Sequence, residues 1–462
     1  MILSIDPGHV AGLGREARAQ LTALLETYEK HRAANDKKNK YYEGRISLSE
    51  VNLGIALPQG MKGLEIGCSW GAKCVDVLAA RSMFDGFVGE NGQTVSELDA
   101  LLAGNRLVAE YPKAARDELK YGCTFATLSS DEAIGCKIRF HSPRTAAALW
   151  DGERGRIACG FAVIDGAHDN VKGEWRPDLV NLYTEGEVWV LRRAGEQWFA
   201  VWYTQPMGRP LMEPMIWGAT SDKPFGRSRI KDPVRRLIDG YVRTIADASI
   251  GLEFATAPQK YLMGVTDQQY DALINDKFRQ YVGSIIAGTA DPNTGEKPTF
   301  GQLQQGTITP HVDMLKLLAA QFGAATGLSV TDTGVVSDAN PTSADAIAEQ
   351  NQTLVAAAEE LNRGNGDALR SIALMAQAVA ANTDLDGLTD EQRQVWPHFK
   401  NPSMPSVAVT ADAAVKIATS RPSFAQTDVY LEMLGFDPAE IRRIKSQEQR
   451  ARGLQLVEEM SV

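Results

Sequence analysis

The sequence predicts an α+β fold, and two patterns along the chain support this class. Short runs rich in β-branched and aromatic residues follow one another over 124–204, with turn signals such as Asp151-Gly152 and Ala194-Gly195 between them. Before and after this block, apolar residues recur every three or four positions, which is typical of amphipathic helices. Helices and strands that occupy separate parts of a sequence indicate an α+β arrangement with antiparallel strands.

The N-terminal part of the chain is expected to form helices. The apolar positions of a first amphipathic helix are Leu13, Ala17, Leu21, Leu24 and Tyr28. The charged run 37–40 that follows is interpreted as a solvated turn, with contact to DNA as the alternative. Further helices are expected over 72–80, 95–109 and 113–121.

The block of strands is expected to fold as one antiparallel meander. Its members are expected over 124–128, 137–141, 146–151, 158–165, 179–183, 187–192 and 198–204. The segment 208–222, which is rich in Pro and Gly, is expected to connect this domain to the centre of the chain.

The central part of the sequence predicts two helices separated by an insert. Asp232-Pro233 is typical of a helix start, because an N-cap carboxylate precedes a proline at the first helical position. The apolar positions of this helix are Val234, Leu237, Ile238, Tyr241, Val242, Ile245 and Ala248. Thr309-Pro310 begins the second helix, and Gly327 ends it. Its apolar positions are Val312, Leu315, Ala319 and Phe322.

A polar loop and a long third helix are expected next. The third helix begins within 342–345, which has a capping-box-like pattern. A separate helix is expected over 367–382, and the segment 389–405 is expected to be irregular. The expected helices of the tail cover 411–420, 427–434 and 438–460.

The chemistry of the chain does not favour an enzyme. The sequence has no Gly-rich phosphate-binding loop, and its six histidines are scattered, so we expect no catalytic, cofactor or metal site. The five cysteines form no Cys-x-x-Cys pair and are expected to be reduced and buried. Proteins that hold DNA through its phosphates usually carry a basic patch. The net charge of −10 therefore favours a conduit that lets DNA slide past, rather than a protein that grips the phosphates. The sequence shows neither a long apolar run nor a signal peptide, so we expect no membrane partner and synthesis in a host cytoplasm.

Five segments of the chain together carry a resemblance to a known family: 40–45, 225–228, 317–328, 340–347 and 396–416. Their order and spacing resemble the portal proteins of tailed bacteriophages, of the siphophage type. The resemblance implies a portal-like α+β fold with an α/β wing, a two-helix stem, a small clip, a long wing helix and a helical crown. The implied boundaries are a wing domain at 1–228, a first stem helix at 229–252, a clip at 253–306, a second stem helix at 307–327, a tunnel loop at 328–342, the long wing helix and a following helix at 343–383, and a C-terminal wing or crown region at 384–462.

The resemblance also implies a function. Portal subunits form a homo-oligomeric ring, typically a dodecamer, at one vertex of the virion capsid. Double-stranded DNA passes through the ring without sequence specificity, inward during genome packaging and outward at genome ejection. The implied partners are the major capsid protein, the large terminase subunit and a head-completion or adaptor protein of the head–tail connector.

Particular residues acquire roles from this resemblance. The tunnel loop, which would face DNA, contains Asp332, Gly334, Val335, Val336 and Asp338 and no basic residue, so it is expected to repel phosphates weakly and to guide them. Stem and ring packing is assigned to Leu237, Ile238, Tyr241, Ile245, Leu315 and Phe322. Three arginines, Arg235, Arg236 and Arg243, either lie on a solvated face, form ion pairs between subunits or contact DNA phosphates.

Two other functions stay open at this point. Another phage head or tail protein could form a ring without serving as the portal, although the order helix, insert, helix, loop, helix argues against it. A hydrolase with a site in the β-rich domain is the second alternative, and no recognisable nucleophile motif supports it.

Overall fold

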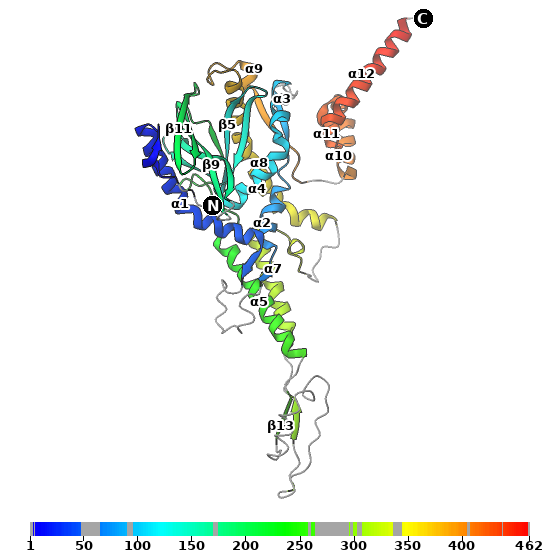
Figure 1. The fold of residues 1–462 in the computed structure, drawn as a ribbon. Helices are drawn as coiled ribbons and strands as arrows, with labels where there is room; N and C mark the ends of the chain where they lie inside the picture. Colours follow the sequence, from blue (N-terminus) through cyan, green and yellow to red (C-terminus); the bar gives the residue numbers. More distant parts are fainter. Residues whose placement is uncertain are drawn as a thin grey trace. The chain divides into compact units, whose positions relative to one another are not determined.

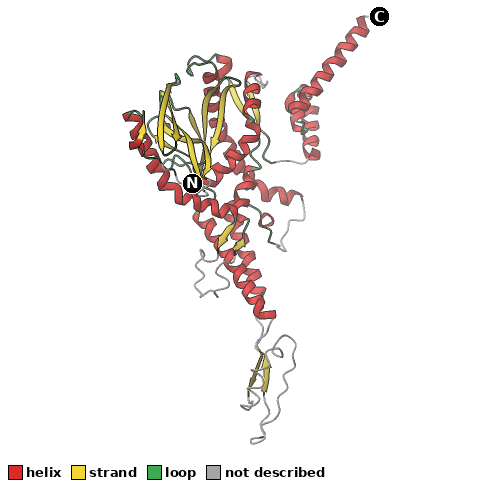
Figure 2. Cartoon of the chain, viewed as in Figure 1, coloured by secondary structure: helices red, strands yellow, loops and turns green. Residues whose placement is uncertain are grey.

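The protein is mixed α and β with antiparallel sheets, which confirms the α+β class expected from the sequence (Figure 2). The computed structural model describes residues 3, 5–47, 65–89, 96–169, 174–256, 260–263, 295, 299–302, 307–335, 344–403, 407–436 and 438–460. The chain forms two compact units, Met1–Lys400 and Asn401–Val462. Within the described ranges, no helix is long and apolar enough to cross a membrane.

A six-stranded sheet in the order β1-β11-β10-β9-β8-β7 forms one layer of the larger unit. Strands β7 to β11 are antiparallel neighbours, and β1 pairs with β11 in parallel. The bounds are β1 Val10–Ala11, β7 Ala146–Asp151, β8 Arg156–Asp169, β9 Glu174–Tyr183, β10 Glu187–Ala194 and β11 Gln197–Thr204. Helix α1, Arg15–Glu43, covers one face, where Leu21 and Leu24 share a buried cluster with Phe161 (Figure 1).

A second sheet has three strands in the order β12-β5-β6, so the single meander expected from the sequence is wrong. Its strands are β5 Cys123–Asp131, β6 Gly135–His141 and β12 Met212–Ile216. The two sheets pack together: Phe125 of β5 and Val188 of β10 belong to the same buried cluster, which removes both side chains from water. The sequence predicts only a connection at β12, where Pro214 is tolerated because the strand lies at a sheet edge.

The buried cluster between the sheets, here called the sheet core, is completed by helices α4, Leu107–Tyr121, and α8, Ala344–Ala380. Its larger members include Phe84, Phe87, Tyr111, Phe125, Leu128, Tyr183, Val188, Met212, Leu369 and Ile372. Helix α8, Ala344–Ala380, is one continuous helix of 37 residues, whereas the sequence predicts two. The expected break lies at Gly364 and Gly366, but the intervening Asn365 is buried and donates hydrogen bonds to Tyr111 Oη (3.0 Å) and Glu118 Oε2 (2.8 Å). These tertiary contacts outweigh the low helix propensity of glycine.

The N-terminal helices differ from expectation mainly at their ends. Helix α1 includes the charged run 37–40 and ends at Gly44, which has a left-handed φ of 69°. The turn expected over 37–40 is therefore wrong, and Lys38 Nζ instead donates to the Tyr121 carbonyl oxygen (2.9 Å). The next helices are α2 Trp70–Ala79, α3 Ser96–Asn105 and α4 Leu107–Tyr121, and α3 and α4 divide at Arg106 with φ of 52°.

The segment 389–405, expected to be irregular, contains two short elements. Helix α9, Asp390–Arg393, is followed by β15, Val395–Phe399, which pairs with β4, Phe84–Gly89. The fully buried Val395 joins the sheet core, which explains why this Pro-containing segment is extended. A further two-stranded ribbon joins β2, Arg45–Ser47, to β3, Glu65–Gly67.

The central helices of the larger unit are α5, Asp232–Thr256, and α7, Thr309–Thr326. The described part of the insert between them holds β13, Lys260–Met263, paired with β14, Thr299–Gln302. A 3-10 turn, η4, covers Val330–Thr333 after α7.

The smaller unit contains α10, Val407–Ser420, α11, Asp428–Met433, and α12, Pro438–Met460, as expected from the sequence to within a few residues. A 3-10 turn, Pro422–Gln426, joins α10 to α11, and Phe424 packs edge-on against Tyr430 with ring centroids 5.9 Å apart. Asp428 forms an ion pair with Lys445 of α12.

Candidate functional site

The central helices α5 and α7 pack directly against each other. A Cβ added at Gly240 of α5 would lie only 3.1 Å from the side chain of Leu318 on α7, so the glycine permits the close approach. The buried residues of both helices form, with parts of α2 and α8, a cluster here called the helix core. Its members include Trp70, Cys74, Leu78, Ile238, Val242, Ala246, Leu318, Ala319, Phe322, Leu354 and Leu361. The helix pair is therefore held against the rest of its unit by a continuous apolar contact.

Trp70, the first residue of α2, joins four segments of the helix core. Its ring centroid lies 4.7 Å from that of Tyr241 on α5 and 4.7 Å from that of Phe322 on α7. Its indole Nε1 donates to the Thr333 carbonyl oxygen (3.0 Å), which satisfies the only polar group of this buried ring. Sequence analysis did not single out Trp70, because an isolated tryptophan at a helix start has no distinctive spacing.

Arg229 is a second residue that sequence analysis missed. Its Nε donates to the Cys74 carbonyl oxygen (2.6 Å), and its Nη2 donates to the Thr326 carbonyl oxygen (2.5 Å) at the last residue of α7. Burial lowers the pKa of this guanidinium from its ordinary value. A cation at a helix C-terminus also interacts favourably with the helix dipole. Arg229 therefore ties the start of α5 to α2 and to the end of α7.

The segment before α5 is fixed by backbone contacts. Gly226 has φ of 69°, and a Cβ there would lie 2.2 Å from the Trp217 carbonyl oxygen, so only glycine fits. Ser228 Oγ donates to the Lys120 carbonyl oxygen (2.6 Å) and accepts from the Ile230 amide (2.9 Å). The sequence 225–228, one of the segments that carry the portal resemblance, thus sets the direction in which α5 leaves the end of α4.

The residues expected to pack the stem fall into three groups by burial. Ile238 and Phe322 are fully buried inside a single chain, so they pack α5 against α7 and cannot form contacts with another subunit. Leu237 and Tyr241 are partly buried against the same helix core. Ile245 and Leu315 are partly exposed.

Helix α7 instead presents apolar side chains that are exposed within the described part of the chain. Met314 is 43% exposed and Leu317 is 52% exposed, and their spacing of three residues places them on one face of the helix. We call these two residues the outer α7 surface. Val312, 43% exposed, lies on another flank of the same helix.

Two of the three arginines expected near the stem have acidic partners within the chain. Arg235 forms an ion pair with Asp232 and donates from Nη1 to the Ile230 carbonyl oxygen (3.0 Å). Arg243 Nε lies 3.9 Å from Asp247 Oδ2. Arg236 is exposed. Arg243 is about half exposed, which fits a solvated face, whereas only 17% of the Arg235 side chain is exposed. Contact of any of the three arginines with DNA stays a prediction.

The first half of the expected tunnel loop packs against its own chain. Ser329 and Asp332 form a capping box around η4, in which Asp332 Oδ2 accepts from the Ser329 hydroxyl (2.7 Å). Leu328 is buried and Val335 is partly buried against the helix core. The chain therefore stays close to the helix core over 328–335, with a turn at Gly334, whose φ of 74° is left-handed. That Asp332, Gly334 and Val335 face DNA stays a prediction. Val336 and Asp338 lie outside the described residues.

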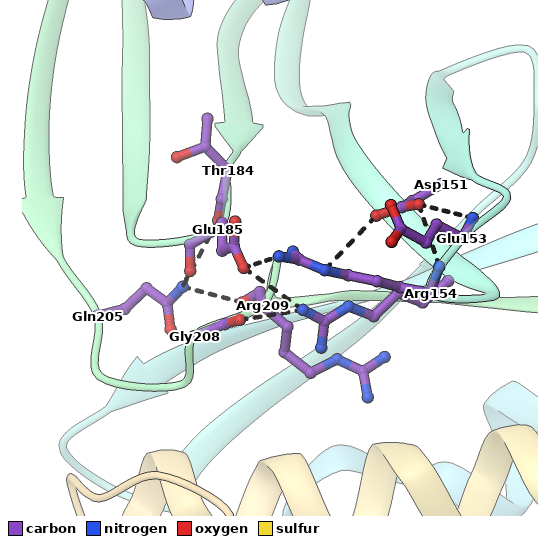
Figure 3. Close-up of polar contacts among 9 residues, drawn as sticks. Asp151, Glu153, Arg154, Thr184, Glu185, Gln205, Gly208 and Arg209 are labelled. Atoms are coloured by element: carbon purple, nitrogen blue, oxygen red, sulfur yellow. Dashed lines mark hydrogen bonds and ion pairs between the residues drawn. The ribbon is translucent and has the colours of Figure 1, made fainter.

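A polar cluster at the strand ends of the larger sheet does not resemble an active site (Figure 3). It borders a cavity of about 430 Å³. Glu185 accepts from Arg154 Nη1 (2.7 Å), and Asp151 Oδ1 accepts from the Arg154 amide (3.1 Å), so both carboxylates have partners. Gln205 Nε2 donates to the carbonyl oxygens of Glu185 (2.6 Å) and Arg209 (2.9 Å). These contacts join three neighbouring turns and leave no free acid and base pair.

Metal-ligating side chains and thiols were the remaining candidates for a reactive site in the described part of the chain. No cluster of three metal-ligating side chains occurs in it. All five cysteines are unpaired and buried, as the sequence predicts, and burial raises their pKa values, to about 11 for Cys68 and Cys159. A thiol with a raised pKa is a poor nucleophile at neutral pH.

One buried carboxyl group is strongly perturbed. Glu118 of α4 has no exposed surface, and desolvation raises its pKa to about 8. It accepts a hydrogen bond from Asn365, which also donates to Tyr111 Oη, and Tyr111 Oη lies 2.6 Å from Ser82 Oγ. The Glu118 carboxyl group lies between α4 and α8 and does not line a described cavity. We therefore assign Glu118 a structural role as a protonated acid.

Comparisons with known proteins complete the description. No family model matches the sequence, and no curated protein matches it. Among solved structures, the chain is similar to chains in the virion of a native gene transfer agent particle (TM-score 0.46) and in the necks of empty and native particles of this kind, computed with C6 (0.47) and C12 (0.43) symmetry. In each case the identity is 13%, and the match covers 80% of this chain and 90% of the other.

Proposed function

We propose that this chain is the subunit of a portal ring in a tailed-phage-type particle. Its copies would surround the channel through which double-stranded DNA enters the capsid and later leaves it. The ring would dock a terminase large subunit during packaging and a head-completion or adaptor protein afterwards, and it would contact the major capsid protein. In this proposal the protein is a structural component of the virion and has no catalytic role.

One observation carries the proposal. Helices α5 and α7 are packed as a pair, they bound an insert in the sequence, and the long helix α8 follows them. This is the order of stem, clip, stem and wing helix that the portal resemblance implies. The outer α7 surface gives the pair an apolar side that a neighbouring copy can cover. Contacts between unlike faces of identical subunits close into a ring when the rotation allows it.

The division of the chain follows from the same proposal. Residues 229–252 and 307–327 would be the stem, 253–306 the clip, 343–383 the wing helix region and 384–462 the C-terminal wing or crown. Within the tunnel loop, only the part beyond Val335 would reach the channel, since 328–335 packs against the helix core. Asp338 would then be the acidic residue that faces DNA, and Asp332 would hold the base of the loop.

Electron microscopy of the purified full-length protein tests the proposal. We expect ring-shaped particles with a central channel and a single rotational symmetry. A protein that stays monomeric at high concentration, both alone and with the major capsid protein, would contradict it. Counting copies in assembled particles separates the portal, with one ring per particle, from another ring-forming head or tail protein. A phosphate-release assay with ATP should show no turnover by the protein alone.

A further inference from the structure

A cleft of about 700 Å³ in the larger unit lies apart from the α5–α7 contact and has no role in the proposed function. It is bounded by the C-terminal half of α1, by the beginnings of β5 and β7, and by the segment 222–232 that leads into α5. Its volume is within the range of about 300–1,000 Å³ that small-ligand sites occupy.

The floor of the cleft is apolar. The buried side chains of Cys123, Phe125 and the alanines of 146–148 line it, and Phe225 forms part of the wall. The Phe225 ring is held by edge-on contacts with Phe125 and Trp150, with centroids 5.9 Å and 5.6 Å apart. The small alanine side chains leave room for an apolar group from outside, while the aromatic wall is rigid.

The rim of the cleft is basic. Its lining includes six cationic side chains, Lys30, Lys38, Lys223, Arg227, Lys231 and Arg235, against the two carboxylates Asp222 and Asp232. Both carboxylates are already engaged, Asp222 with Arg227 (3.7 Å) and Asp232 with Arg235. The excess of four positive charges contrasts with the net charge of −10 on the whole chain.

All four lysines of the lining lack an acidic partner in the described part of the chain: Lys30, Lys38, Lys223 and Lys231. Lys38 is the most deeply placed of them, and its Nζ has only neutral acceptors, Asn35 Oδ1 (3.2 Å) and the Tyr121 carbonyl oxygen (2.9 Å). Desolvation lowers the pKa of Lys38, so an approaching carboxylate would relieve the cost of burying this cation.

We propose that the cleft binds a short acidic segment of a partner protein, with an apolar side chain on the floor and carboxylates at the lysine rim. Charge complementarity identifies the chemistry of the partner, because the unpaired lysines attract anions and the floor requires an apolar group. A DNA duplex fits poorly: it is too wide to enter the cleft, and its exterior offers phosphates without apolar side chains. An inorganic anion would leave the apolar floor uncovered.

The test measures binding of labelled probes to the full-length protein by fluorescence anisotropy. The probes are the peptide Glu-Asp-Leu-Phe-Glu-Asp-Leu-Glu, a version with Ser in place of Leu and Phe, a version with Lys in place of the acids, and a short DNA duplex. We expect binding only of the first peptide. Reversing the charge of two rim lysines, Lys30→Glu with Lys231→Glu, should weaken it by about tenfold or more, since attraction becomes repulsion near the surface.

A matched control carries the same change in net charge away from the cleft. Lys37→Glu with Lys400→Glu alters two exposed lysines that do not line the cleft, one of them on the same helix as Lys30, and should leave binding unchanged. Equal weakening in both double variants would mean that only overall charge matters, and the proposal fails. The proposal also fails if the DNA duplex competes for the cleft as well as the peptide does. It fails too if Lys30→Glu with Lys231→Glu changes only the oligomeric state and not peptide binding, because a second copy of the chain would then occupy the cleft.

Discussion

The outer α7 surface gives the sharpest test of ring assembly. Replacing Met314 and Leu317 with Glu places two carboxylates where the proposed ring has an apolar contact. Full burial of a Leu or Met side chain is worth about 1.5–3 kcal/mol. Because Met314 is 43% exposed and Leu317 52% exposed in the single chain, about half of that remains to be gained for each residue on assembly. The pair therefore contributes about 2 kcal/mol to each interface between subunits.

The Glu side chains would remove this contribution and add the cost of burying unpaired charges, about 2 kcal/mol or more. A loss of about 4 kcal/mol per interface lowers the association constant roughly a thousandfold. Since both positions are exposed in the single chain, the unfolding free energy should change by only about 0.5 kcal/mol. Mass photometry is expected to show monomers, while thermal unfolding of the subunit is unchanged.

The control for this experiment is Val108→Glu, which changes an apolar residue of α4 with a similar exposure of 47%. It should leave the rings intact. Rings formed at the wild-type yield by the Met314→Glu, Leu317→Glu variant would refute the assignment of α7 to the interface. Ile238→Asp is unsuitable as a test, because its side chain is fully buried and the subunit itself would unfold.

Three further predictions concern the fold that supports α5 and α7. Gly226→Ala should lower the unfolding free energy by more than about 1–3 kcal/mol in a urea titration. The alanine would have to adopt a left-handed φ, and its Cβ would lie 2.2 Å from the Trp217 carbonyl oxygen. Gly152→Ala, which has open space around the added Cβ, should be nearly neutral in the same titration. Arg229→Lys should lower the unfolding free energy by about 1–3 kcal/mol, since one ammonium cannot donate to both buried carbonyl oxygens. Arg227→Lys, at an exposed site, should leave the unfolding free energy unchanged, and equal effects of the two changes would contradict the assigned contacts. Glu118 has a pKa of about 8 in the folded protein against 4.5 in the unfolded chain, so between these pH values the native state binds one more proton than the unfolded state. The wild-type unfolding free energy should therefore fall as pH rises from about 5 to 8, by up to about 1.4 kcal/mol per pH unit. Glu118→Gln should remove this slope, and an unchanged slope in the variant would show that another group is responsible.

Most helices could be predicted from the sequence because their signals are local. The Asp232-Pro233 start of α5 and the Gly327 end of α7 follow from capping residues and apolar spacing alone. The division of the strands into two sheets could not be predicted in this way. It depends on which strand β5 pairs with, and β12 lies far along the chain in a segment where Pro214 argues against a strand.

The candidate site was predictable only in part, for a similar reason. Apolar spacing identifies Ile238 and Phe322 as packing residues, but it does not reveal whether the partner is the same chain or another copy. In the structure the partner is the same chain, because Trp70 packs against Tyr241 of α5 and Phe322 of α7. Trp70 lies far from both helices in the sequence, so no local pattern predicts this contact. Arg229 likewise acts through the ends of α2 and α7, which no local pattern brings together.

The continuity of α8 has a consequence for how the larger unit unfolds. Leu354 and Leu361 in its first half belong to the helix core, while Leu369 and Ile372 in its second half belong to the sheet core. With about 1.5 Å per residue, its 37 residues form a single rod of about 55 Å. Neither core can lose its share of this helix without exposing part of the other core. Calorimetry of the larger unit should therefore record one cooperative transition, in which the van't Hoff enthalpy equals the calorimetric enthalpy.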